Sequence, residues 1–225
     1  MKTTARAVRP QRRLALQVAA AALIASFATH SPGQAERPDP AVRPIGLFYD
    51  ALLAVMKDAQ RLGFQGRYDK LAPVIRATFD LPAMTRIAVG SDWGTIAADQ
   101  QAQLIENFTQ MTIATYANRF DGFSGERFEV EPVSEVRNTG RLVRTKLYPS
   151  KGEPVSLNYL MRGSGDAWKA VDVYLTGTIS ELATRRTEFA AILKAGGPGA
   201  LVESLRQQAE KQRPPGQGKS EATKR

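Results

Sequence analysis

The chain has 225 residues, no cysteine, a single histidine and a formal net charge of +9. Five basic residues fall within residues 1–35, and six basic and two acidic residues fall from Arg206 onward. Of the totals of 31 and 22, residues 36–205 therefore hold 20 basic and 20 acidic residues. The excess charge belongs to the two ends, so it gives little support for nucleic-acid binding, and the lack of cysteine excludes disulfides and thiol nucleophiles.

Residues 1–35 have the pattern of a secretory signal peptide. A basic start precedes an apolar run of about 15 residues, LALQVAAAALIASFA, and small residues at 33–35 suit cleavage. The run is shorter than the roughly 20 residues of a membrane span, and an uncleaved N-terminal anchor is the alternative. Cleavage would remove His30, leaving a periplasmic protein with no histidine base and no His or Cys metal ligand.

Residues 36–212 form the predicted folded domain, whose first half has apolar residues at helical spacing. The predicted helices occupy residues 44–62, 67–79, 80–90 and 97–119. Pro44 suits a first helical turn, Gly63 ends the first helix, and Asp80 is placed to cap the third.

Beyond Gly122 the apolar period falls to two, which predicts strands. Four antiparallel strands are expected around 127–131, 143–147, 155–161 and 171–175, joined by hairpin loops at 138–140, 150–152 and 163–166. Two helices, 178–195 and 198–211, would follow, and the Pro/Gly/Lys-rich residues 213–225 are predicted to be disordered. The predicted fold is α+β, a four-stranded antiparallel meander packed against helices as a cone that is either filled with side chains or hollow.

No nucleotide-binding or hydrolase motif is present, and Gly163-Ser164-Gly165 fits a hairpin turn. Asp172 and Tyr174 share a face of the last strand and are the best acid/base candidates, which leaves an isomerase or dehydratase as the alternative function. The simpler interpretation is that Asp172 accepts hydrogen bonds from a loop. Arg185-Arg186 is either a phosphate-binding pair or a solvated helix face.

Five segments of the predicted domain carry a resemblance to a known family. They are FDLPAMTRIAVGSDW (79–93), AADQQAQLIENFTQMTIATYANRF (97–120), GEPVSLNYLMRG (152–163), WKAVDVYLTGTISELATRRTEFAAIL (168–193) and GGPGALVESL (196–205). In order and spacing they resemble the MlaC family of periplasmic lipid carriers. The run GTISELATRRTEF (177–189) is more similar to the hopanoid-associated HpnM branch.

The resemblance implies a periplasmic shuttle without catalytic residues, metal or cofactor, folded as a cone similar to nuclear-transport-factor-like domains. Its cargo would be phospholipid or hopanoid, moved between the inner and outer membranes. The implied partners are an inner-membrane complex of the Mla or resistance-nodulation-division type and an outer-membrane lipoprotein complex. Such carriers are associated with outer-membrane lipid asymmetry and toluene tolerance.

Under this resemblance the apolar face of the sheet and the helices facing it become the walls of a lipid cavity. We predict that the sheet wall consists of Val143, Leu147, Leu157, Tyr159, Met161, Val173 and Leu175. We predict that the helical wall consists of Phe108, Met111, Ile179, Leu182 and Phe189. The stripe of Phe108, Met111 and Tyr116 on the long helix fits either a cavity wall or a filled core, since both need apolar side chains.

Overall fold

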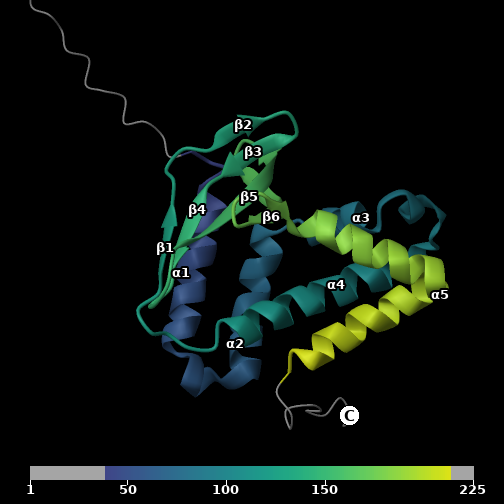
Figure 1. The fold of residues 1–225 in the computed structure, drawn as a ribbon, viewed down its shortest axis with the longest axis horizontal. Helices are drawn as coiled ribbons and strands as arrows, with labels where there is room; N and C mark the ends of the chain where they lie inside the picture. The colour runs from purple at the N-terminus through teal and green to yellow at the C-terminus, as the bar shows by residue number, and fades with distance from the viewer. Residues whose placement is uncertain (1–38, 214–225) are drawn as a thin grey trace, which may run out of the picture. The chain divides into compact units, whose positions relative to one another are not determined.

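The computed structural model describes residues 39–213, and the predicted signal segment and the tail after Arg213 lie outside this range (Figure 1). The first half of the described chain is helical, as the sequence predicts. Its elements are α1 (Arg43–Lys57), α2 (Ala59–Thr78), α3 (Leu81–Val89), the 3-10 helix η1 (Gly90–Thr95) and α4 (Ala98–Arg119).

The starts and ends of these helices agree with the prediction in part. Asp80 caps α3, since its side chain accepts a hydrogen bond from the backbone N–H of Ala83 at 3.1 Å. The predicted break at Gly63 is present, because Gly63 (φ +59°) is non-helical and divides α2, but a further break that the sequence did not predict ends α1 at Lys57. The apolar stripe continues across the break, so helical spacing alone does not reveal it.

The second half of the described chain contains an antiparallel sheet of seven strands. They are β1 (Arg127–Val130), β2 (Glu135–Arg137), β3 (Gly140–Val143), β4 (Thr145–Tyr148), β5 (Val155–Ser164), β6 (Ala167–Leu175) and β7 (Ile179–Ser180). One edge of β5 pairs with β6, and its other edge pairs with both β3 and β4. The strand β5 is therefore the centre of the sheet.

The count of seven strands, against four predicted, has a local cause. β3 and β4 are two halves of one predicted strand, interrupted at Arg144, whose carbonyl accepts a hydrogen bond from the Glu131 N–H at 3.0 Å. β1 and β2 pair with β4 and β3 respectively, and they are separated by a segment that contains Pro132, which has no N–H to donate. Turns at 138–139 and 165–166 lie within the predicted loops at 138–140 and 163–166, and bends occupy the third predicted loop at 150–152.

The final helix begins three residues later than predicted. Thr176 (φ +51°) and Gly177 (φ +83°) turn the chain, and β7 then pairs with the end of β6. Only then does α5 (Glu181–Lys211) begin, capped by the Ser180 hydroxyl, which accepts from the Ala183 N–H at 2.9 Å. A kink at Gly197 (φ +71°) divides α5 where the sequence predicts two helices.

The buried core lies between the inner face of the sheet and the helices, and α4 and α5 run side by side beneath it (Figure 1). Its largest fully buried side chains include Tyr159 from β5, Phe48 from α1, Phe79 after α2 and Phe189 from α5. No helix within residues 39–213 is both long and apolar enough to cross a bilayer.

Candidate functional site

A cavity of about 560 Å³ opens between the inner face of the sheet and helices α1, α4 and α5. This volume is within the usual range of ligand pockets. The lining residues are Phe48, Tyr49, Leu52, Phe79, Met84, Phe108, Met111, Thr112, Thr115, Tyr116, Arg119, Phe120, Phe128, Leu147, Val155, Leu157, Tyr159, Val173, Leu175, Thr176, Glu181, Leu182 and Arg185. The space between the sheet and the helices is therefore partly hollow.

The sheet wall of the cavity follows directly from strand alternation. Leu147 on β4, Leu157 and Tyr159 on β5, and Val173 and Leu175 on β6 all line it. The register places them together, because Tyr159 pairs with Val173 and Leu157 pairs with Leu175 across the β5–β6 ladder. Pairs on one face of a sheet point the same way, so these five side chains form a continuous apolar surface.

The helical wall contains three of the predicted residues, Phe108 and Met111 on α4 and Leu182 on α5. Tyr116, one α4 turn beyond Thr112, lines the same space. On α4, the lining residues Phe108, Met111, Thr112 and Tyr116 follow at helical spacing, so this helix presents one stripe of side chains to the cavity over about two turns.

Four of the twelve predicted residues do not line the cavity. Val143 and Met161 are fully buried in the core. Phe189 is also fully buried and packs edge-on against Phe108, with ring centroids 6.3 Å apart. Ile179 lies on β7 and is 55% exposed, because the chain is still extended at this point and the helix has not begun.

Sequence reasoning missed the contribution of α1. Phe48, Tyr49 and Leu52 line the cavity, and Phe48 packs edge-on against the ring of Tyr116 at 5.3 Å. The helical spacing of Phe48 and Leu52 shows that α1 has an apolar face. Spacing does not show which helix covers the sheet, so the sequence carries no signal for their place in the cavity.

A hydroxyl network lies in the apolar wall. Tyr49 donates to the Tyr159 hydroxyl at 2.9 Å, and the Tyr49 and Thr145 hydroxyls are 2.7 Å apart. Burial raises the pKa of Tyr49 to about 12 and raises the pKa of Tyr159 well above its ordinary value. Both phenols therefore stay neutral at physiological pH, and the interior of the cavity carries no charge.

Charged and exposed residues mark the opening of the cavity. Arg119 at the end of α4 and Thr176 in the turn after β6 are exposed, and Glu181 and Arg185 stand on the first turns of α5. Glu181 and Arg185 form an ion pair at 3.3 Å. The opening therefore joins a charged rim to an apolar interior.

The acid/base candidates lie away from the cavity, since neither Asp172 nor Tyr174 lines it. The buried Asp172 carboxylate accepts hydrogen bonds from the Ser180 hydroxyl at 2.6 Å, the Val173 N–H at 2.8 Å and the Leu182 N–H at 3.2 Å. Asp172 thus fastens β6 to the start of α5. The interpretation as a structural carboxylate fits these contacts.

The two neighbouring arginines of α5 differ in role. Arg185 lies at the rim, paired with Glu181 and with Glu188 at 3.2 Å. Arg186 lies outside the cavity, and its guanidinium rests against Gly90, where an added Cβ would come within 2.9 Å of its Nε. Of the two, only Arg185 therefore lines the cavity.

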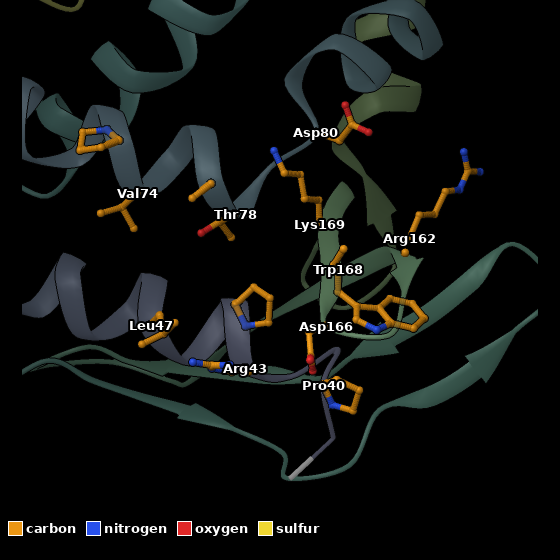
Figure 2. A pocket seen from close by; sticks show the side chains of 15 residues that line it. Pro40, Arg43, Leu47, Val74, Thr78, Asp80, Arg162, Asp166, Trp168 and Lys169 are labelled. Carbon is orange, nitrogen blue, oxygen red and sulfur yellow. The ribbon is translucent and has the colours of Figure 1, made fainter. Parts of the chain in front are cut away.

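A second hollow, which we call the groove, has a larger volume of about 900 Å³ (Figure 2). It lies between α1, α2 and the β5–β6 hairpin. The residues that line it include Leu47, Val74, Trp168 and Lys169. Several of its polar groups are already bonded within the fold. The ammonium group of Lys169 donates to the Arg76 carbonyl at 3.1 Å, and Trp168 Nε1 donates to the Gly165 carbonyl at 2.9 Å.

Comparison with known proteins identifies a family and related solved structures. The sequence profile of a family described as MlaC protein matches residues 48–207. A solved phospholipid-binding protein from Ralstonia solanacearum, in complex with a phospholipid, is 26% identical, with a TM-score of 0.67, over 76% of this chain and 98% of that one. No functionally curated protein matches. Within residues 39–213, no group of three acidic or histidine side chains is placed to hold a metal ion.

Proposed function

Because the chain belongs to the MlaC family, we propose that it is a periplasmic lipid-binding shuttle that carries phospholipid between the inner and outer membranes. The observation that carries the proposal is the cavity of about 560 Å³, with an apolar interior and a charged rim. Acyl chains would fill the interior, and the polar headgroup would stay at the opening with Arg119 and Arg185. Arginine is well suited to hold a phosphate there.

The physical chemistry of the cavity favours an apolar occupant. Water against an apolar wall supplies fewer contacts than a dense apolar occupant would, so the empty cavity forgoes contact energy. Acyl chains would recover that contact energy and would themselves leave water at about 0.8 kcal/mol per CH₂ group. The same energy prevents a lipid from crossing the aqueous periplasm unaided, which is the need that a carrier meets.

Export and partners follow from the same proposal. The predicted signal peptide at residues 1–35 would deliver the protein to the periplasm. There it would exchange cargo with an inner-membrane complex of the Mla or resistance-nodulation-division type and with an outer-membrane lipoprotein complex. The similarity of residues 177–189 to the HpnM branch makes a hopanoid the second candidate cargo.

The test is to purify the protein without detergent from a bacterium that makes both lipid classes, and to identify bound lipid by mass spectrometry. Stoichiometric phospholipid is the expected result, and stoichiometric hopanoid would assign the second cargo. A folded protein that carries neither lipid, and that takes up no apolar dye, would contradict the proposal.

A further inference from the structure

The hydroxyl groups that line the cavity differ in whether they have a hydrogen-bond partner within the protein. The Thr112 and Thr115 hydroxyls donate to the carbonyls of Phe108 and Met111, each at 2.8 Å, and the Thr176 hydroxyl donates to its neighbour's carbonyl at 2.7 Å. Tyr49 and Tyr159 bond to each other at 2.9 Å. These five hydroxyls are therefore occupied within the protein.

The Tyr116 hydroxyl is different. No hydrogen bond joins it to another of the described residues, and since none of their fully buried side-chain oxygens is unpaired, its oxygen is accessible from the cavity, although its ring is firmly held. The ring stacks on Phe120 at 5.9 Å and meets Phe48 edge-on at 5.3 Å and Phe79 at 6.0 Å. Three aromatic neighbours fix the phenol in place, so the direction of its hydroxyl is set before any ligand arrives.

Tyr116 also occupies a distinct level of the cavity. It lies one turn before the end of α4, next to the rim residue Arg119, while Met111 and Phe108 line the same wall five and eight residues earlier. Burial raises its pKa, with smaller effects from Tyr49 inside and from Glu181 and Arg119 at the rim. The neutral hydroxyl thus stands between the apolar interior and the charged opening.

We propose that the Tyr116 hydroxyl donates a hydrogen bond to an acyl-ester carbonyl of the bound lipid, and so selects ester-linked cargo. This inference rests on the proposed carrier function. In a glycerolipid the ester carbonyls lie between the apolar chains and the charged headgroup, the order that this cavity presents from interior to rim. A polar group in an apolar wall is stabilised when a ligand supplies its missing partner.

The test compares two synthetic phospholipids with the same headgroup and chain length, one with two ester linkages and one with two ether linkages. Ether oxygens are weaker acceptors and the carbonyls are absent. The purified, delipidated protein is incubated with an equimolar mixture, and native mass spectrometry gives the ratio bound. Wild type should prefer the ester lipid about fivefold, the ratio for one net hydrogen bond of about 1 kcal/mol.

The Tyr116→Phe variant should lose this preference while still binding the ether lipid as wild type does. The matched control is Tyr68→Phe, which removes a helix-borne hydroxyl outside the cavity and should keep the preference. Equal binding of the two lipids by wild type, or an unchanged preference in Tyr116→Phe, would overturn the inference and leave the carrier proposal standing. If neither lipid binds wild type, the carrier proposal itself fails.

The stability of the lipid-free protein gives a second measurement. Since the Tyr116 hydroxyl has no partner among the described residues, lipid-free Tyr116→Phe should melt at the wild-type temperature or slightly above it. A clear fall in melting temperature would mean that the hydroxyl serves the fold, and the inference would be wrong.

Discussion

The cavity and the groove are both hollows with apolar side chains, and the groove is the larger, at about 900 Å³ against about 560 Å³. Their walls differ in origin. Strand alternation and a helical stripe build the cavity, so its interior is mostly apolar and its charged residues stand at the rim. The groove mixes Leu47 and Val74 with Arg43, Arg162 and Lys169. Under the proposed function the cavity is the lipid site in spite of its smaller volume, because charged side chains line the groove but stand only at the rim of the cavity.

The largest expected effect comes from placing one carboxylate in each hollow. Leu157→Asp puts a charge on the sheet wall of the cavity, and we expect at least a tenfold loss of copurified lipid, because an acyl chain cannot solvate a buried carboxylate. Leu47→Asp puts the same charge in the groove, where Leu47 is already 57% exposed, and should leave lipid content unchanged. Lipid is quantified by mass spectrometry and folding is checked by circular dichroism. Equal lipid loss in the two variants would show that the cavity is not the specific site.

A smaller effect, on stability alone, is expected from Asp172→Asn. The substitution weakens hydrogen bonds from the Ser180 hydroxyl and the Val173 and Leu182 N–H groups, and should lower the free energy of unfolding by about 1–3 kcal/mol. Lipid content should not change, because Asp172 does not line the cavity. Urea denaturation measures the first quantity and lipid extraction the second. Loss of lipid from a stably folded variant would restore Asp172 as a functional residue.

The sheet wall of the cavity was predictable from sequence, and the reason is geometric. A strand has a period of two, so Leu157 and Tyr159 share a face wherever the strand lies, and the partner strands bring Val173 and Leu175 beside them. The order of helices and strands was predictable for the same kind of reason, because each element carries its own periodicity.

What escaped prediction depends on contacts between distant parts of the chain. The place of α1 over the sheet depends on packing that no local pattern records, so Tyr49 was missed. Val143 and Met161 lie on the inner face of the sheet, as predicted, but at positions where side chains from the helices fill the space completely. Periodicity identifies an apolar face, and only the three-dimensional arrangement separates a filled region from a hollow one.

Acid should weaken the contacts of Asp39, which lies next to the groove. Asp39 precedes the groove residue Pro40, and its carboxylate accepts hydrogen bonds from the Ser134 N–H at 2.8 Å and the Ser134 hydroxyl at 2.6 Å, and from Arg141 at 3.1 Å. Burial alone would raise the pKa of Asp39, but the hydrogen bonds from Ser134 and Ala41 and the charge of Arg141 outweigh it and hold the pKa below its ordinary value of 3.8.

Because the folded-state pKa is lowered, this carboxylate stabilises the fold fully above its ordinary pKa and loses that effect as the pH falls through the lowered value. Asp39→Asn should therefore be less stable than wild type by about 1 kcal/mol at neutral pH. The difference should shrink as the pH falls well below 3.8. Urea denaturation of both proteins across the acid range measures it. A difference that stays constant with pH would show that the charge of Asp39 contributes nothing.

The smallest expected effect is spectroscopic. The chain has two tryptophans, and neither Trp93 nor Trp168 lines the cavity, whereas Trp168 lines the groove. Loading delipidated wild type with phospholipid should therefore leave its tryptophan emission maximum unchanged. Phe120→Trp places a reporter on the cavity wall, where the Phe120 ring stacks on Tyr116 at 5.9 Å, and its emission should shift to shorter wavelength as lipid replaces water. A shift in wild type that Trp168→Phe abolishes would mean that lipid enters the groove. The groove, and not the cavity, would then be the lipid site.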